Sequence, residues 1–342
     1  MVHSFTAPDL VRACYRTLLG REAESDKVVE ARAAAANSAE TMLTSFTDSD
    51  EFRAHVAGKI IHDYLMANYY NDCLDIEVDV SERILDQMFD RIRQEWSMLG
   101  DTEPYWSVIT SDKFRANKIK EHMEAFLTSG RSNVKWMKNI AKRNGIDLGK
   151  QQTCFELGCG VGRLTLPLSE VFHHVTGYDI SPGNLAECDA LVKAQGKRNI
   201  TTKLLARIED LKSAPEFDVL FTVIVLQHNP PPVQKYILDI LLTKIRPNGI
   251  AYFQLPTFIP DYKFTARTYL RTKPQSMEMH AVPMRDVLEL LREHGFQVLE
   301  VLQDPFTGMP GSHSFFAVKT AEVTMEATPP PDRGIWRRLS GR

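Results

Sequence analysis

Short apolar runs alternate with segments of helical periodicity through the second half of the chain. Seven runs have the apolar and β-branched character of strands, at residues 153–157, 175–179, 200–205, 217–225, 250–255, 296–302 and 314–318. Apolar positions recur at helical spacing over residues 163–172, 230–244 and 282–294. This alternation predicts an α/β fold with a doubly wound, mostly parallel seven-stranded sheet, which binds ligands at the carboxyl ends of its strands.

The turn after the first strand combines three alternating glycines with an acidic residue. Gly158, Gly160 and Gly162 can take positive φ and, lacking a Cβ, let the main chain lie flat against a ligand. Glu156 stands two positions before the first glycine. About twenty residues later the next strand ends at Asp179, where a carboxylate is placed to accept both hydroxyls of a ribose. The two features together indicate a nucleoside site.

This glycine turn resembles the first motif of class I S-adenosylmethionine-dependent methyltransferases, whose later landmarks follow in order over about residues 130–320. The resemblance implies a Rossmann-like fold, S-adenosyl-L-methionine as the cofactor and a closing antiparallel hairpin. Glu156 would serve the cofactor ammonium, directly or through water. Beside Glu156 and the three glycines, the expected cofactor contacts are Cys159, Arg163, Asp179, Ile180, Ile208, Glu209 and Val225; Cys159 is given no chemical role.

The sequence departs from the family at the adenine-contacting loop. Many relatives have an acidic residue at the position that aligns with Arg207. The adenine amino group would therefore be met by Glu209, Asp210 or a main-chain carbonyl.

His228 is the candidate catalytic base. It follows the run 217–225 and is expected at the carboxyl end of that strand, facing the reactive methyl. An ordinary histidine pKa of about 6.5 suits removal of a proton from a hydroxyl acceptor. The alternative is that His228 caps the following helix or hydrogen-bonds a main-chain carbonyl. His280 is a second candidate, and no metal is expected because Gln227, His228 and Asn229 supply no acidic ligand.

Acceptor contacts are predicted from two regions. The longest stretch without helix or strand pattern is 256–281, where aromatic and cationic residues interleave. Tyr262 and Arg267 of this stretch suit stacking on a sugar ring and pairing with a phosphate or carboxylate. Tyr105 and Trp106 belong to a helical segment that, in the family, lies across the cofactor pocket. A solvated loop and ordinary core packing are the alternatives.

Four regions follow from these patterns: a small helical domain at 1–60, a helical linker or lid at 61–145, the methyltransferase domain at 146–320 and a disordered basic tail at 321–342. The string at residues 15–21 and the later Ser-x-Glu-Phe at 49–52 resemble a short helical domain of unknown function found beside surface-glycan enzymes. That resemblance implies a sugar acceptor, on a surface polysaccharide or its precursor. A helical hairpin packed on the catalytic domain is the alternative.

The net charge and the composition limit the classes of partner that the protein is expected to bind. The chain has 342 residues, 43% hydrophobic content, net charge −3 and five cysteines. This charge provides no basic field for nucleic acid. We find no signal peptide and no membrane span, and expect a cytoplasmic protein, with weak membrane-surface contact through the basic tail as a minor possibility. The oligomeric state stays open, as do two other functions: methylation of a small molecule or lipid headgroup, and a non-catalytic cofactor-binding scaffold.

Overall fold

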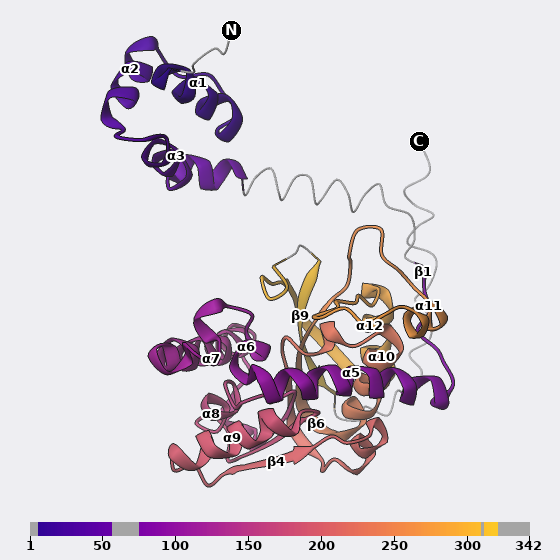
Figure 1. Ribbon diagram of the computed structural model, residues 1–342. Coiled ribbons are helices and arrows are strands. Elements are labelled where there is room, and N and C mark those ends of the chain that lie inside the picture. Colours follow the sequence, from indigo (N-terminus) through magenta and orange to yellow (C-terminus); the bar gives the residue numbers. More distant parts are fainter. Residues whose placement is uncertain (1–5, 57–74, 309–310, 321–342) are drawn as a thin grey trace, which may run out of the picture. The chain divides into compact units, whose positions relative to one another are not determined.

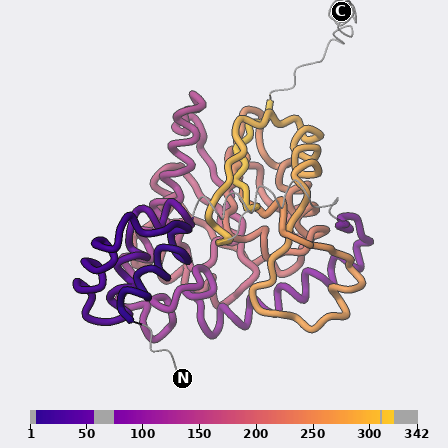
Figure 2. Tube along the Cα trace, turned by 90° about the horizontal axis from the view of Figure 1, so that it is seen from above, coloured from indigo at the N-terminus to yellow at the C-terminus, as the bar shows by residue number. Residues whose placement is uncertain are grey.

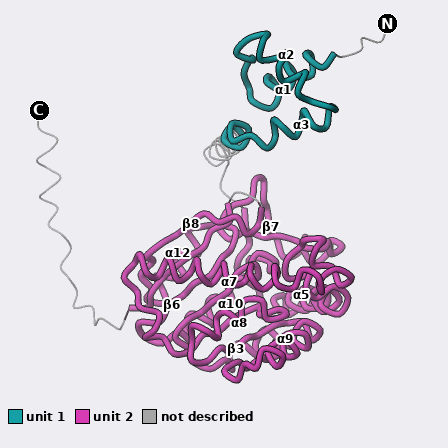
Figure 3. Tube along the Cα trace, turned by 90° about the vertical axis from the view of Figure 1, so that its left-hand side faces the viewer, with its two compact units in different colours: residues 1–73 teal, residues 74–342 magenta. Residues whose placement is uncertain are grey.

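The computed structural model describes residues 6–56, 75–308 and 311–320 (Figure 1). The chain divides into two compact units, Met1–Cys73 and Leu74–Arg342, which Figure 3 colours separately. The predicted boundary at residues 60 and 61 and the predicted tail both lie outside the described residues. Helices at 82–143, predicted as a linker or lid, belong to the same compact unit as the sheet.

The first unit is helical and has a core of its own. It contains α1 (Ala7–Leu18), α2 (Asp26–Ala35) and α3 (Ala39–Thr47), and residues 50–56 are again helical. Its buried core comprises Val11, Cys14, Tyr15, Leu19, Val29, Met42 and Phe46. The helices α2 and α3 are separate because Ser25 and Ser38 each cap a helix with their side chains.

The second unit is built on the predicted sheet. Its strand order is β4-β3-β2-β5-β6-β9-β8, and β9 runs in the direction opposite to the other six strands. The strands are β2 (Thr153–Leu157), β3 (His174–Asp179), β4 (Ile200–Leu204), β5 (Phe217–Thr222), β6 (Ile245–Pro256), β8 (Phe296–Gln303) and β9 (Ser312–Lys319). In Figure 2 the yellow β9 lies beside the orange β8. The predicted fold class and closing hairpin are confirmed.

Helices cover both faces of this sheet. Alternate side chains of the strands enter two separate cores, so Phe155 and Leu220 pack with α5 (Glu82–Thr102), α10 (Pro231–Lys244) and α12 (Met284–Glu293). Cys154 and Phe221 pack on the other face with α7 (Ile119–Arg143) and α8 (Thr165–Leu168). The remaining elements are α6 (Pro104–Val108), α9 (Pro182–Ala194), η1 (Asp112–Phe114), η2 (Leu148–Lys150), η3 (Ile208–Ser213) and η4 (Leu226–His228). In Figure 1, α5 runs past α9 and α10, which it contacts.

Two predicted elements need correction. The helix expected over 163–172 is the single turn α8; the Asn199 side chain donates to the main-chain oxygens of Ser169 and Phe172, where a longer helix would continue. The strand expected to reach Val225 ends at Thr222, because Ile224 adopts a left-handed φ of 62°.

The stretch 256–281 is less irregular than its sequence indicated. It contains β7 (Lys263–Phe264) and α11 (Ala266–Arg271). β7 pairs in parallel with β1 (Asp75–Ile76), a partner nearly two hundred residues away in the sequence. The side chain of Thr265 caps α11. Long-range pairing and a short capped helix therefore order this stretch.

Candidate active site

The glycine turn is enclosed on several sides. Gly158, Gly160 and Gly162 all adopt positive φ, of 72°, 52° and 88°. A Cβ added to Gly158 would lie 2.2 Å from Cγ2 of Val225, and one added to Gly160 would lie 2.7 Å from Cγ2 of Val108 in α6. Both the backbone conformation and the close approach of neighbours therefore require glycine here.

Asp179 ties this turn to the end of β3. Its Oδ2 accepts a hydrogen bond from the Gly160 N–H at 2.8 Å, and its Oδ1 accepts one from the Ser181 N–H at 2.8 Å. Burial raises the pKa of Asp179 to about 6, against these backbone hydrogen bonds, which favour the ionised form. The carboxylate that was predicted to bind the ribose thus also holds the glycine turn in position.

Glu156 and Arg163 form a buried and incompletely paired acid and base. Burial raises the pKa of Glu156 to about 8 and lowers the pKa of Arg163 to about 10. Arg163 Nη1 donates to Asn133 Oδ1 at 2.7 Å, whereas Arg163 Nε and both Glu156 oxygens have no hydrogen-bond partner among the described residues. Buried polar groups are normally paired. An ammonium and a carboxylate from one amino-acid moiety would satisfy both groups, which fits S-adenosylmethionine.

A cavity lies between the carboxyl ends of the strands and the helices α5 and α6. The residues that line it are Phe89, Ile92, Trp96, Ser107, Val108, Leu157, Gly158, Cys159, Gly160, Arg163, Leu164, Tyr178, Asp179, Ile180, Asn184, Leu205, Val223, Ile224, Val225, His228, Asn229 and Ile237. We call it the cofactor cavity. It brings together most of the predicted cofactor residues with the candidate base.

Four predicted cofactor residues are not in this lining. Glu156 and Gly162 are neighbours in sequence of Leu157 and Arg163, which do line the cavity. Ile208 is buried in the core, and Glu209 is exposed and paired with Arg207. Leu205, which sequence reasoning missed, lines the cavity where adenine contacts were expected. Its N–H donates to the Asp179 carbonyl at 2.8 Å, a contact between neighbouring strands that no local motif announces.

A second cavity shares part of its wall with the first. Both are lined by Ser107, Val108, Arg163, Ile224 and His228. The rest of its wall consists of Ile109, Thr110, Ser129, Ser132, Asn133, Trp136, Gln227, Met277, Met279, Pro305, Phe306 and Thr307. The Trp136 and Phe306 rings pack at 5.5 Å between centroids, and Trp136 is 42% exposed. We call this the acceptor cavity, because it adjoins the cofactor cavity and presents aromatic surface to solvent.

His228 lies in η4, directly after β5, and faces both cavities. Its Nδ1 is 3.0 Å from the Glu278 carbonyl oxygen, and its Nε2 is 3.1 Å from Gln227 Nε2. The Trp96 ring of α5 packs against it at 5.0 Å. Burial lowers the pKa of His228 to about 4, more than the bond to the Glu278 carbonyl raises it. The imidazole is therefore neutral at neutral pH. His228 borders both cavities, which is compatible with a role as a base, and it hydrogen-bonds a main-chain carbonyl, as the alternative predicted.

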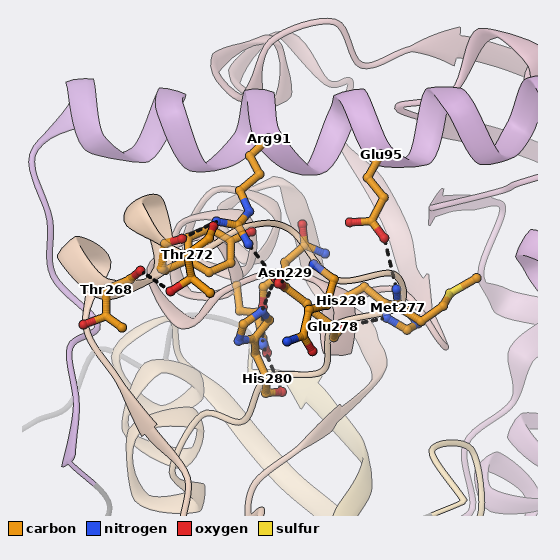
Figure 4. Close-up of polar contacts among 12 residues, drawn as sticks. Arg91, Glu95, His228, Asn229, Thr268, Thr272, Met277, Glu278 and His280 are labelled. Atoms are coloured by element: carbon orange, nitrogen blue, oxygen red, sulfur yellow. Dashed lines mark hydrogen bonds and ion pairs between the residues drawn. The ribbon is translucent and has the colours of Figure 1, made fainter.

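The segment around Glu278 is fastened to α5 and to His228 (Figure 4). Arg91 Nη2 donates to Glu278 Oε1 at 2.8 Å, and Glu95 Oε1 accepts from the Met277 N–H at 3.0 Å. Met277 itself has a left-handed φ of 59°. These contacts place the methionines of this segment in the wall of the acceptor cavity.

The predicted acceptor residues Tyr105 and Trp106 are placed elsewhere. The Tyr105 hydroxyl donates to Glu187 Oε2 at 3.0 Å. The Trp106 ring packs under the Arg115 guanidinium, 4.0 Å from it. Within the described part of the chain, neither side chain lines the cofactor or the acceptor cavity. Their immediate neighbours, Ser107 and Val108, are the residues of α6 that do.

Tyr262 and Arg267 line neither cavity as the described residues define them. The Tyr262 hydroxyl is 2.7 Å from His280 Nδ1, and both side chains are at least partly buried. Arg267 is exposed on α11. The interleaved pattern therefore places aromatic rings inside and cations outside. His280, the second candidate base, is surrounded by Tyr262, Phe264 and Tyr269.

The described ranges contain neither a metal-binding cluster nor a membrane-spanning helix. No cluster of three or more histidine, cysteine, aspartate or glutamate side chains suited to a metal ion occurs in residues 6–56, 75–308 or 311–320. No helix in these same ranges combines the length and apolar character needed to cross a membrane.

Comparison with known proteins agrees with this geometry. A family model described as a methyltransferase domain matches residues 155–249. The tRNA U34 carboxymethyltransferase of Shewanella halifaxensis (strain HAW-EB4) is 26% identical over 163 residues, 47% of this chain and 46% of that protein. The ubiquinone biosynthesis O-methyltransferase of Rickettsia akari (strain Hartford) is 32% identical over 97 residues, 28% and 37% of the two chains. This chain thus spans less than half the length of either relative.

Among solved structures, phosphoethanolamine N-methyltransferase 1 of Haemonchus contortus, in complex with phosphoethanolamine and S-adenosylhomocysteine, superposes with a TM-score of 0.50. The identity is 14%, over 71% of this chain and 51% of that one, which supports the fold alone. The chain carries a class I S-adenosylmethionine-dependent methyltransferase domain, as the glycine turn predicted. S-adenosylmethionine is the cofactor of this domain class.

Proposed function

We propose that the protein is an O-methyltransferase that methylates a sugar hydroxyl on a surface polysaccharide or its precursor. The observation that carries the proposal is the position of His228, a neutral imidazole shared by the cofactor and acceptor cavities. A hydroxyl acceptor needs a group that takes its proton, and an amine acceptor that binds unprotonated does not need one as strongly.

The residues of the cofactor cavity suit S-adenosylmethionine, which supplies an activated methyl group when bound. Glu156 and Arg163 would hold the amino-acid moiety, since each has unpaired polar atoms. Asp179 would hold the ribose hydroxyls, and Ile180 and Leu205 offer apolar surface for the adenine. None of these residues is needed as a proton acceptor, which leaves that role to His228.

His228 would act in the transfer step itself. His228 would take the hydroxyl proton as the acceptor oxygen gains the methyl group that the cofactor supplies, and would then pass it to solvent. A low pKa keeps the imidazole unprotonated over the whole neutral range. Its basicity is correspondingly small, so its contribution depends on holding the acceptor oxygen in position as well as on accepting the proton.

The acceptor class rests on two observations. The exposed face of Trp136 at the acceptor cavity suits the apolar face of a sugar ring. The helical first unit resembles one found beside surface-glycan enzymes. A second candidate, a small aromatic molecule or lipid, is favoured by the apolar wall of Met277, Met279 and Phe306.

The test is to incubate the full chain with methyl-labelled S-adenosylmethionine and host extract, then count label in separate fractions. Label in polysaccharide or glycolipid is the expected result, and label in the small-molecule, lipid, protein or nucleic-acid fraction would replace the acceptor. His228→Ala should reduce transfer roughly a hundredfold or more while cofactor binding persists. His173→Ala, at an exposed histidine, is the matched control. Cofactor binding without label in any fraction would favour a non-catalytic scaffold.

A further inference from the structure

We propose that Gln254 is a positioning residue that, through Gln227, fixes His228 in the tautomer with its proton on Nδ1 and an unprotonated Nε2. The inference rests on the proposed function for its catalytic meaning, but the tautomer itself follows from hydrogen-bond directions. A histidine used as a base must keep one ring nitrogen unprotonated, and which one is decided by its hydrogen-bond partners.

The first group that fixes the orientation of these side chains is the main-chain N–H of Ile224. The Ile224 N–H lies 2.9 Å from Oε1 of Gln254, which is fully buried. An N–H can only donate, so the amide oxygen of Gln254 must face Ile224. Its amide nitrogen then faces Gln227 Oε1 at 3.0 Å and Ser312 Oγ at 2.8 Å, and donates to both. The orientation of an otherwise ambiguous amide is thereby determined.

The orientation of the Gln254 amide determines that of Gln227, and Gln227 in turn determines the role of His228 Nε2. Because Gln227 Oε1 accepts from Gln254, the amide nitrogen of Gln227 is the end that lies 3.1 Å from His228 Nε2. An amide nitrogen has no lone pair to offer, so His228 Nε2 must be the acceptor and carries no proton.

The second such group, the main-chain carbonyl of Glu278, is independent of the first. His228 Nδ1 lies 3.0 Å from the Glu278 carbonyl oxygen, which can only accept. Nδ1 must therefore carry the ring proton. The Glu278 side chain pairs with Arg91 of α5 (Figure 4), which holds the segment that bears this carbonyl. Two main-chain groups, at opposite ends of the chain of bonds, assign the same tautomer.

Gln254 is also held in place by its hydrogen bond to Ser312. Ser312 Oγ accepts from Gln254 and donates to Asp304 Oδ1 at 2.6 Å. The residue that Gln254 holds, Ile224, is β-branched with φ 62° and lines both cavities. Such a backbone conformation persists only where surrounding contacts impose it. Gln254 thus fixes the floor of the two cavities together with the orientation of the base.

Several charged or titratable groups surround His228. They are Arg91 and Glu95 of α5, Glu278 and His280 on the segment beside it, and Arg163 and Asp179, which line the same cavity. Gln254→Glu keeps an oxygen toward Ile224 but puts an acceptor where the donor stood. The Gln227 amide would then turn, its oxygen would face Nε2, and both ring nitrogens would be bonded as donors. We expect this variant to favour the imidazolium.

The experiment is long-range proton–nitrogen correlation on full-length protein with ¹⁵N-labelled histidine. His228→Gln identifies the His228 signals by their loss. The wild type should show a protonated Nδ1 and an unprotonated Nε2 at neutral pH. In Gln254→Glu the pKa of His228 should rise by roughly one unit or more, and the acid limb of the rate profile should move with it. Gln297→Glu, with the same charge change on an exposed position of β8, should leave both unchanged.

A wild-type spectrum with the proton on Nε2 would overturn the proposal, as would an unchanged His228 titration in folded Gln254→Glu. If that variant does not fold, Gln254→Met tests the same contact without a buried charge, and should populate the other tautomer in part. The spectrum needs no acceptor. Full activity of His228→Ala would therefore reject the catalytic base and leave the tautomer assignment to be judged separately.

Discussion

Gly130 of α7 lies against the main-chain oxygen of Arg163, so closely that a Cβ on Gly130 would be 2.0 Å from that oxygen. The helix and the residue after the glycine turn therefore meet without an intervening side chain. Because Arg163 borders both cavities, the position of α7 determines the shape of the site.

Gly130→Ala should separate these two segments. Neither main chain can yield by a side-chain rotation, so we expect a loss of about 1–3 kcal/mol in the free energy of unfolding. Urea denaturation measures the change, and calorimetry with S-adenosylhomocysteine should show weaker binding. Lys138→Ala, at an exposed position of the same helix, is the control. Unchanged stability in Gly130→Ala would show that α7 is free to move away.

Glu156→Gln should alter the pH dependence of stability. Folding raises the pKa of Glu156 from 4.5 to about 8, so the folded state favours the protonated carboxyl. The resulting stability is complete below about pH 4.5 and is lost as the pH rises through 8. The amide variant avoids that loss, so its urea midpoint should exceed that of the wild type at pH 9 and match it near pH 4.

The same substitution should weaken cofactor binding, because the amide cannot pair with an ammonium. Glu293→Gln, at an exposed position of α12, should change neither property. A wild type whose stability is level from pH 5 to 9 would contradict the raised pKa of Glu156.

Asp179→Asn tests the link between the glycine turn and β3. An asparagine places an NH2 group where one of the two carboxylate oxygens stands, so either the Gly160 or the Ser181 N–H faces a donor and loses its acceptor. We expect binding of S-adenosylhomocysteine to weaken roughly tenfold or more, measured by calorimetry. Asp189→Asn, at an exposed position of α9, should bind normally. Equal affinities for the two variants would remove Asp179 from the cofactor site.

Trp136→Ala tests the acceptor cavity. Loss of the ring should raise the KM for the acceptor by about tenfold and leave the Kd of the cofactor unchanged, because Trp136 lines only the acceptor cavity of the two. Steady-state kinetics with a labelled methyl donor gives the first quantity, and calorimetry gives the second. Leu288→Ala, another exposed apolar side chain, is the control. An unchanged KM would place the acceptor elsewhere.

The sequence predicted those features whose cause is local. Each strand of the sheet has its own apolar pattern, and the turn at Gly158, Gly160 and Gly162 needs residues that tolerate positive φ. Asp179 could be predicted because strand spacing alone places it beside that turn. The fold follows from these elements, whereas the class of cofactor follows from the resemblance of the turn to the first motif of class I methyltransferases.

The acceptor cavity depended on contacts between distant segments. The Trp136 ring packs on Phe306, and His228 hydrogen-bonds the Glu278 carbonyl. The hydrophobic periodicity of the sequence does not predict contacts between such distant residues. The aromatic residues near Tyr262 were expected to bind substrate, yet they pack inward, because α11 supplies an apolar face that its short length concealed. Side chains chosen for their chemistry alone were therefore placed less well than main-chain elements.

The first unit shows a different kind of separation. Val11, Tyr15 and Phe46 are buried among α1, α2 and α3 themselves, within a compact unit distinct from the sheet. In evolutionary terms this makes the unit portable. Gene fusion can join it to another enzyme, or remove it from this one, while the residues that line the cofactor and acceptor cavities keep their own scaffold.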